Sequence, residues 1–406
     1  MKLKQDSQTS NLIKEQQRIE EGQINLIASE SYAPQAVLDV VGSILTDKYS
    51  EGYPDKRYYP GNEIYDKLES LVQKRALDLF KLSSKTWNVN VQSYSGAIAN
   101  GEIYSALLEP GDTILALDLS AGGHLSHGSR ASITSKWYTI YHYGVDANYR
   151  INYVQLEKLA TQHKPKLIIS GASAYPFKIN FRKISEIAKK VGALHLADIS
   201  HYAGLISAGV YPSPFLYADV VMSTTHKSLF GPRGAIIWSR TLIAKKIDRA
   251  VFPGMQGGPH MNTIAGIGVG LGIAKKSKAY YARVAQNAKA LSAAFKKLGG
   301  AVIGGGTESH VILLDARPLG LHGGEVEYIL EQVGILANRN AIAGDVSVQE
   351  PSAIRMGTYA VTQRGMKSKQ MSQIAILVYK VVSGEENILH AQQVVRKLTR
   401  DFPIKR

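Results

Sequence analysis

Strand-like and helix-like segments alternate through the middle of this chain, and this alternation restricts the possible folds more than any other feature. Short apolar runs at 113–117, 167–170 and 193–197 are separated by stretches with helical spacing of apolar residues, at 153–163 and 182–191. Two parallel strands need a long crossover connection, which is usually a helix. The pattern therefore predicts an α/β fold, a three-layer sandwich in which helices cover both faces of a mainly parallel central sheet.

A second unit follows the alternating segments. Residues 264–298 form one long helical stretch, and a strand at 311–314 and helices near 323–333 and 368–383 come after it. We therefore expect a smaller C-terminal α+β domain.

The composition excludes several kinds of chemistry. The 406 residues include no cysteine, which rules out disulfides, thiolate nucleophiles and cysteine-ligated zinc. Residues 1–23 lack an apolar central stretch, and the most apolar later window, 264–274, is short and rich in glycine. We therefore expect no secretory signal and no membrane span, and a soluble cytoplasmic protein.

The net charge of +15 leaves two classes of partner open. Lysine and arginine neutralise phosphates, so the chain could be chiefly an RNA-binding protein. The basic residues are, however, spread along the chain, and the densest groups, at 245–246 and 275–278, are short. We therefore expect a generally basic surface that attracts anionic small molecules, and not nucleic acid as the main partner.

Three short stretches lie where a parallel sheet places its ligand sites. Ligands bind outside the carboxyl ends of parallel strands. Residues 93–100, 198–201 and 223–227 each follow a predicted strand closely. These stretches are therefore the first candidates for a functional site.

Lys227 lies at the expected start of a loop, after an apolar strand at 218–222. A lysine attacks a carbonyl only when its amine is partly neutral, and burial or nearby positive charge favours the neutral form. Arg233 and His226 are close enough along the chain to supply such charge. An ordinary solvated loop lysine also fits this position, and from the position alone it is the commoner case.

Asp198 directly follows the predicted strand at 193–197. Buried aspartates are uncommon unless they are paired. An aspartate at one strand end and a lysine at a neighbouring one match the needs of pyridoxal 5'-phosphate, since the lysine forms a Schiff base and the aspartate keeps a proton on the pyridine nitrogen. The alternative is that Asp198 only caps the next turn.

Two further signals are weaker. Ser95, Gly96 and Ala97 precede a predicted helix, whose N-terminal amides would suit a phosphate, although small residues also make ordinary N-caps. Arg355 could hold a carboxylate through two hydrogen bonds, or it could be an ordinary surface arginine.

His124 and His127 raise the question of a metal. Together with Asp198 and His201 they could be drawn as a metal site, but no HExxH-type spacing supports it, so we expect no metal. His124 is the better candidate for a flat ring stacked on a cofactor.

Longer blocks of sequence occur in an order and spacing typical of one enzyme family. They are LIASESY (26–32), DKYSEGYPDKRYYPGN (47–62), SGAIAN (95–100), GGHLSHG (122–128), ADISHYAGLISAGVYPSPF (197–215), STTHKSLFGPRG (223–234), VFPGMQGGP (251–259) and IRMGTYAVTQRG (354–365). Together they resemble the serine hydroxymethyltransferases, pyridoxal-phosphate enzymes of the aminotransferase superfamily with fold type I. The resemblance runs from about residue 20 to the C-terminus, and the blocks around Tyr49–Pro54 and Gly122–Gly128 are its most specific parts.

The resemblance implies a role for each residue around a pyridoxal 5'-phosphate. Lys227 would form the Schiff base, Asp198 would pair with the pyridine nitrogen, and His124 would stack on the ring. The other residues implied to hold the cofactor are Ser95, Gly96 and Ala97 at the phosphate, Tyr49 and Gly258 reaching the phosphate across a dimer, Ser173 and His201 beside the phenolic oxygen, and Thr224, His226 and Arg233 near the lysine.

The resemblance further implies the reversible conversion of L-serine and tetrahydrofolate to glycine and 5,10-methylenetetrahydrofolate. Arg355 would hold the amino-acid carboxylate, and Glu51 of a second subunit would handle protons, with Tyr58 beside it. The other residues implied to contact substrates are Ser29, Tyr59 and His201 for the amino acid, and Leu119, Gly123, His124, Leu125 and Asn340 for tetrahydrofolate.

A homodimer with active sites at its interface is also implied. The chain would divide into residues 1–55, a helical arm and a segment that contributes to the dimer, residues 56–275, the large cofactor-binding α/β domain, and residues 276–406, the small α+β domain.

Some positions depart from the family pattern. Ala97 stands where a second serine is usual, Tyr94 stands where a histidine-like polar residue is usual, and the 341–351 loop lacks the usual Ser-Pro-Phe. The alternative enzyme is therefore a folate-independent pyridoxal-phosphate aldolase that acts on 3-hydroxy amino acids. The alternative of another class is the RNA-binding protein.

Overall fold

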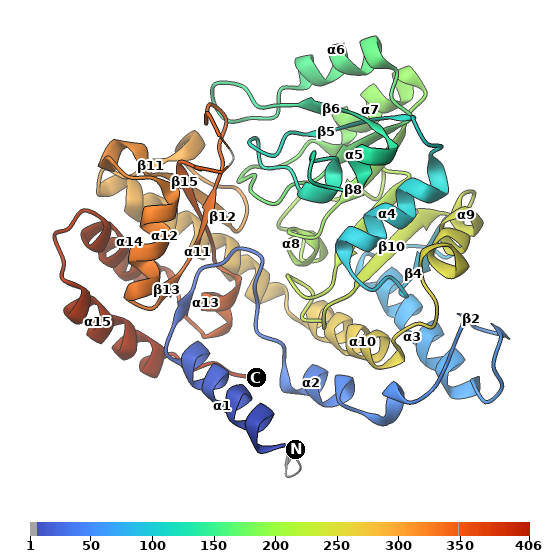
Figure 1. The fold of residues 1–406 in the computed structure, drawn as a ribbon, viewed down its shortest axis with the longest axis horizontal. Helices are drawn as coiled ribbons and strands as arrows, with labels where there is room; N and C mark the ends of the chain where they lie inside the picture. Colours follow the sequence, from blue (N-terminus) through green and yellow to red (C-terminus); the bar gives the residue numbers. More distant parts are fainter. Residues whose placement is uncertain (1–5, 348) are drawn as a thin grey trace.

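The computed structural model describes residues 6–347 and 349–406. Figure 1 shows a large α/β unit built around one sheet, with a smaller unit at its side that carries the C-terminal helices. Helix α1 (Ser7–Glu21) and helix α15 (Ile388–Asp401) approach each other at their C-terminal ends, next to the smaller unit. Arg406 and Glu20 form an ion pair of 2.6 Å there.

The largest sheet has seven strands within the described residues, in the order β4-β10-β9-β8-β7-β5-β6. Its strands are β4 (Trp87–Asn90), β5 (Thr113–Leu117), β6 (Thr139–Tyr143), β7 (Leu167–Ser170), β8 (Leu194–Asp198), β9 (Val220–Thr224) and β10 (Ala235–Arg240). Strands β5 to β9 pair in parallel, whereas β10 runs antiparallel to both of its neighbours. The prediction of a mainly parallel sheet is confirmed.

Alternate residues of each strand face opposite sides of this sheet, because successive side chains of a strand point in opposite directions. On β5, Ile114 and Ala116 belong to one apolar cluster, and Leu115 and Leu117 belong to another. The first cluster includes residues of α4 (Gly96–Leu107) and α9 (Ala244–Arg249), and the second includes residues of α3 (Glu63–Leu79), α6 (Tyr153–His163), α7 (Phe181–Val191), α8 (Ala203–Ser207) and α10 (Met261–Lys276). The three-layer sandwich follows from this arrangement.

The smaller unit has its own sheet, in the order β11-β12-β15-β14. Its elements are β11 (Ala301–Val302), β12 (Val311–Asp315), β14 (Asn338–Asn340), β15 (Ala353–Gly357), α11 (Lys278–Lys297), α12 (Gly323–Gln332), α13 (Tyr359–Gln363) and α14 (Ser368–Val382). A separate apolar cluster lies among these elements, as expected for an α+β domain.

A segment from the N-terminal end of the chain packs into this smaller unit. Strand β1 (Ile24–Asn25) pairs in parallel with β13 (Ile335–Leu336), and Ile24 and Leu26 are buried in the apolar cluster of the smaller unit. The division of the chain at residues 55 and 275 stays a prediction.

The long helical stretch expected at 264–298 is two helices, α10 and α11, which meet at Ser277. The Ser277 hydroxyl donates to the carbonyl oxygen of Ile273 at 2.8 Å. A short polar side chain that bonds to the local backbone competes with continuation of the helix. The spacing of apolar residues does not reveal such a break. No helix in the described ranges combines the length and apolar character that crossing a bilayer requires.

Arg57 anchors a small hairpin of β2 (Gly52–Tyr53) and β3 (Lys56–Arg57) on α3. Its guanidinium donates to Asp66 at 2.8 Å and to Glu69 at 2.6 Å, and Arg57 and Glu69 are nearly inaccessible to solvent. The hairpin therefore has a defined position, although much of its outer surface is exposed. Helices α2 (Gln35–Val41) and α5 (Thr134–Trp137) complete the fold.

Candidate active site

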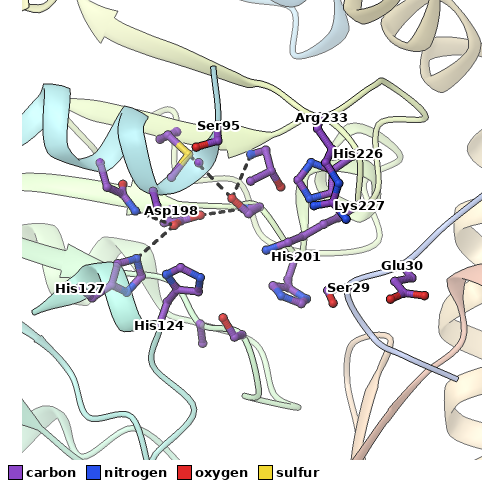
Figure 2. A pocket seen from close by; sticks show the side chains of 18 of the residues that line it. Ser29, Glu30, Ser95, His124, His127, Asp198, His201, His226, Lys227 and Arg233 are labelled. Atoms are coloured by element: carbon purple, nitrogen blue, oxygen red, sulfur yellow. Dashed lines mark hydrogen bonds and ion pairs between the residues drawn. The ribbon is translucent and has the colours of Figure 1, made fainter. Parts of the chain in front are cut away.

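The carboxyl ends of the parallel strands open into a cavity of about 370 Å³. Figure 2 shows Lys227, His201 and Asp198 around its centre, with His124 and His127 on one side and Ser29 on the other. The sequence-predicted residues that line it are Ser29, Ser95, Gly96, Ala97, His124, Ser173, Asp198, His201, Thr224, His226, Lys227, Arg233 and Arg355. All three strand-end stretches singled out from the sequence thus meet at one place.

Lys227 follows β9 and is 8% exposed. Burial lowers its pKa to about 8, and the positive charges of Arg355 and Arg233 act in the same direction, against the carboxylate of Asp198. A solvated loop lysine, the alternative that the sequence left open, is excluded by this burial. The amine is therefore partly neutral near physiological pH, which attack on a carbonyl requires.

Asp198 is the last residue of β8, and three hydrogen bonds hold its carboxylate. Nε2 of His127 lies 3.1 Å from Oδ2, Nδ2 of Asn100 donates to the same oxygen at 3.3 Å, and the backbone N–H of Ser200 donates to Oδ1 at 3.0 Å. Burial alone would raise the pKa of Asp198, but the His127 hydrogen bond and the charges of His127 and Lys227 outweigh it and hold this pKa well below its usual range. Asp198 therefore does cap the next turn, through the N–H of Ser200. The same side chain is also an ionised carboxylate that lines the cavity.

The N-terminus of α4 forms another wall of the cavity, with Ser95 as its N-cap. A Cβ at Gly96 would lie 2.5 Å from Cγ2 of Thr224, so only glycine lets this helix start approach the end of β9. The Thr224 hydroxyl and Nδ1 of His226 are buried and have no hydrogen-bond partner within the described part of the chain. Free amides, orphaned polar atoms and the nearby Arg233 together fit a phosphate group.

Arg355 projects from β15 into the same cavity. Its Nε donates to Oδ1 of Asn338 at 3.1 Å and its Nη1 to the carbonyl oxygen of Ser173 at 3.0 Å. It forms no ion pair with any residue of 6–347 or 349–406, and burial lowers its pKa to about 10. A guanidinium held this way without a carboxylate partner fits an anionic ligand, and it is not the ordinary surface arginine of the alternative reading.

A second cavity, of about 350 Å³, adjoins the first and shares His124, Ser173 and Arg355 with it. The residues that the family resemblance assigns to tetrahydrofolate line it together, namely Leu119, Gly123, Leu125 and Asn340. A cavity that touches the lysine cavity along one wall suits a second substrate that must reach the first.

Five predicted residues lie outside both cavities of their own chain, namely Tyr49, Glu51, Tyr58, Tyr59 and Gly258. Tyr49 and Tyr59 pack on each other with ring centroids 5.3 Å apart, and Tyr58 is 71% exposed. A Cβ at Gly258 would contact the Tyr49 ring at 3.2 Å, so the chain at Gly258 lies against the segment that precedes the β2–β3 hairpin. Tyr59, expected in the amino-acid pocket, is therefore not brought to the pocket of its own chain.

Asn100, His127 and Ser200 also line the cavity, but the sequence analysis gave none of them a role at a cofactor. Asn100 is the last residue of the block SGAIAN, and His127 is the last but one of the block GGHLSHG. Nothing in the local sequence links either residue to Asp198. Among the described residues there is no group of three or more histidine, aspartate and glutamate side chains that could hold a metal ion.

Comparison with known proteins gives one consistent result. Residues 3–378 match the family model described as serine hydroxymethyltransferase. The chain is 47% identical to the serine hydroxymethyltransferase of Coprothermobacter proteolyticus, over 94% of this chain and 92% of that protein. It is 47% identical to that of Wolbachia pipientis and 44% identical to that of Myxococcus xanthus, in each case over 98% of this chain and 96% of the relative.

These relationships decide between the three readings of the sequence. Near-complete coverage by serine hydroxymethyltransferases favours the folate-dependent transferase over the aldolase and over the RNA-binding protein. The enzymes of this family depend on pyridoxal 5'-phosphate and use tetrahydrofolate as co-substrate. The chain belongs to the serine hydroxymethyltransferase family and interconverts L-serine and tetrahydrofolate with glycine and 5,10-methylenetetrahydrofolate.

Proposed function

We propose that Lys227 binds the aldehyde carbon of pyridoxal 5'-phosphate and that Asp198 keeps a proton on its ring nitrogen. The observation that carries this assignment is that the Lys227 amine and the Asp198 carboxylate face one cavity from the ends of neighbouring strands, β9 and β8. When bound, the cofactor withdraws electrons from the α-carbon of the amino acid and so weakens its bonds.

The remaining cavity residues hold the reactants in place. The amides at Ser95, Gly96 and Ala97 and the Thr224 hydroxyl bind the phosphate, with Arg233 and His226 beside the lysine. Ala97 offers no side-chain hydroxyl for this purpose, so the backbone and Thr224 have the larger share. Oriented binding of this kind lowers the barrier by removing motions that the reaction would otherwise have to restrict.

The amino acid binds between two groups of polar side chains. Arg355 holds its carboxylate, and Ser29 and His201 line the same cavity. His124 and Ser173 border both cavities and face the cofactor ring and its phenolic oxygen. With the carboxylate held, the bond to the departing one-carbon unit can align with the electron-withdrawing ring, next to the tetrahydrofolate cavity.

The pH dependence of cofactor uptake tests the assignment of Lys227. Its lowered pKa means that the amine loses its proton at a lower pH than a solvated lysine. The rate at which the apoprotein takes up pyridoxal 5'-phosphate, followed by visible absorbance, is expected to rise with pH and then to level off. The midpoint of this rise is expected at a pH of about 8, the pKa of Lys227. Replacing Arg233 by methionine removes a nearby positive charge and is expected to move this midpoint upward. A midpoint near the value of a free lysine, about 10.4, would contradict the assignment.

We further propose that the protein is a homodimer in which Glu51 completes the active site of the partner subunit, with Tyr58 beside it and Tyr49 and Gly258 at the partner's phosphate. Glu51 lies outside the cavity of its own chain, on a well-anchored hairpin. Apolar side chains are exposed around that hairpin and on α1, including Tyr58, Ile44 at 80% and Leu12 at 67%. Exposed apolar side chains of this kind support an interface. A second copy would bring Glu51 and Tyr59 to a cavity that they do not line in their own chain.

Mixed dimers test this arrangement. Dimers of Lys227→Ala with Lys227→Ala, or of Glu51→Gln with Glu51→Gln, are expected to be nearly inactive. Co-expression of the two variants is expected to restore about a quarter of wild-type activity, because half of the dimers are hybrids and each hybrid has one complete site.

The matched control combines Lys227→Ala with Arg355→Leu. Both of these residues line the cavity of their own chain, so a hybrid of these two variants has no complete site and is expected to stay inactive. Absence of recovery in the Lys227–Glu51 mixture, with dimers confirmed by analytical ultracentrifugation, would place Glu51 in its own subunit and contradict the proposal.

We keep the cytoplasm as the proposed location. The complete absence of cysteine fits a reducing compartment. Fractionation of cells that produce the chain tests this, and recovery in a secreted fraction would contradict it.

A further inference from the structure

A second histidine lies behind His201, away from the cavity. His310 directly precedes β12 and is completely buried. Its Nε2 lies 3.3 Å from Nδ1 of His201 and 3.2 Å from the carbonyl oxygen of Ala28. The two imidazole rings are nearly parallel, with an angle of 19° and centroids 5.5 Å apart. His310 does not line the cavity, so any effect on chemistry must act through His201.

The partners of His310 have fixed positions. The main chain of Ala28 packs so closely on Gly357 of β15 that a Cβ at Gly357 would lie 2.4 Å from Cα of Ala28. Tyr359 donates its hydroxyl to the carbonyl oxygen of His201 at 2.8 Å, and its ring lies 4.3 Å from that of His310. The contact between the histidines is therefore set by packed backbone and aromatic rings.

Both imidazoles are neutral in this environment. Burial lowers the pKa of His310 to about 3, and the positive charges of Arg355 and Lys227 act in the same direction. Burial and the charge of Lys227 lower the pKa of His201 well below its usual range. A neutral imidazole carries one N–H, so each ring has one donor and one acceptor nitrogen.

The carbonyl oxygen of Ala28 decides which nitrogen of His310 carries the hydrogen. A carbonyl oxygen only accepts, so the 3.2 Å contact is a hydrogen bond only if Nε2 of His310 donates. The opposite tautomer would set two lone pairs against each other. It would also put the hydrogen on Nδ1, which has no partner in the described residues. A buried N–H without an acceptor is unfavourable, which disfavours that tautomer.

The same hydrogen decides the tautomer of His201. The single hydrogen on Nε2 of His310 is shared between the carbonyl oxygen of Ala28 and Nδ1 of His201, so Nδ1 of His201 must be unprotonated and accept. The single N–H of His201 then lies on Nε2, the nitrogen left for the cavity. We propose that His310 is a positioning residue that holds His201 in its Nε2–H tautomer, so that His201 presents a donor to an oxygen atom of the bound cofactor or amino acid. The functional part of this inference rests on the proposed place of His201 in the site.

Nitrogen NMR of the holoenzyme, labelled with ¹⁵N in its histidine rings, reads the tautomers directly. His201 is expected to show a protonated Nε2 and an unprotonated Nδ1, and His310 a protonated Nε2. The signals of His310 are assigned by their loss in the variant His310→Gln, and those of His201 by their loss in His201→Asn. A proton on Nδ1 of His201 in the unaltered protein would overturn the proposal.

Two substitutions separate donation from packing. His310→Phe keeps a ring of similar size but has no N–H, whereas His310→Gln keeps an N–H donor near the place of Nε2. We expect His310→Phe to lower kcat for serine by about tenfold with little change in KM, because one hydrogen bond that orients a reacting group is lost. His310→Gln is expected to recover most of this loss, and the exposed change His390→Phe is expected to have no effect.

The outcomes are distinguishable. Equal loss of kcat in the Phe and Gln variants would mean that His310 acts by packing alone, and this would overturn the proposal. If His310→Phe does not fold, the tautomer signals of the unaltered protein and the kinetics of His310→Gln still decide it. If the tautomers are as expected but serine kinetics do not respond, the donor role of His201 at the cofactor or amino acid is wrong, whereas the lysine assignment is unaffected.

Discussion

Replacing Lys227 by alanine is expected to lower the rate of glycine formation from serine by roughly three orders of magnitude or more, since the amine that binds the cofactor covalently is lost. The visible absorbance of the lysine-bound cofactor is expected to disappear at the same time. Both effects follow from the burial of Lys227 beside Asp198 in the principal cavity. Purified protein, a serine assay with tetrahydrofolate and an absorbance spectrum provide the measurement.

Lys245 offers a matched control, because it is an exposed lysine on α9. Lys245→Ala is expected to keep both the activity and the absorbance. Borohydride reduction of the wild-type holoenzyme followed by peptide mass mapping should find the cofactor on the peptide that contains Lys227. Cofactor found on another lysine would refute the assignment.

Replacing Arg364 by leucine is expected to lower the free energy of unfolding by about 3–5 kcal/mol, because several buried carbonyl oxygens lose their donor and each such loss costs about 1–3 kcal/mol. Arg364 is 1% exposed and lies just after α13. Its guanidinium donates to carbonyl oxygens of residues 20, 21 and 23 and of residues 399 and 402, over distances of 2.7 to 3.4 Å. No carboxylate takes part in these bonds.

These carbonyls belong to the C-terminal ends of two helices, α1 and α15, or directly follow them. The last carbonyl groups of a helix have no partner within the helix and carry its negative dipole end, so a cation stabilises them. Arg364 thus caps two helices at once and joins the N-terminal arm to the C-terminal helix. Leucine would leave these acceptors without their donor.

Chemical unfolding of Arg364→Leu and Arg364→Lys measures this effect. Lysine keeps the charge but lacks the planar array of five donors, so we expect an intermediate loss of stability. Arg182→Leu is the control, because Arg182 lies on the surface of α7 in an i,i+4 pair with Glu186 and such pairs contribute little. A stability change of Arg364→Leu as small as that of the control would show that the shared capping is unimportant.

Much of the large domain was predictable because its signals are local. Strand 113–117 and helix 153–163 have the bounds expected from apolar spacing and turn residues. Lys227 and Asp198 were expected to lie together because residues that follow parallel strands face the same edge of the sheet, and they do line one cavity. The break at Ser277 was missed, since an amphipathic pattern can continue across a change of direction.

The neighbours of the site residues were not predictable in the same way. Asp198 meets Asn100 and His127, which lie 98 and 71 residues away along the chain. Their blocks were recognised, but periodicity carries no information about which distant side chains meet. The position of Glu51 outside its own cavity likewise depends on how the β2–β3 hairpin packs on α3.

The sequence by itself determined the layered α/β architecture, the strand ends that meet at the principal cavity, and the motif blocks of the serine hydroxymethyltransferase family. Only the tertiary structure decided how strongly Lys227 is buried, which nitrogen His201 presents to the cavity, and that Arg364 caps two helix ends. The physical reason is that spacing along the chain reports local backbone preference, whereas burial and hydrogen-bond partners are set by contacts such as His201–His310, 109 residues apart. Chemistry at this site depends on those contacts, because they determine the charge and proton position of each reacting group.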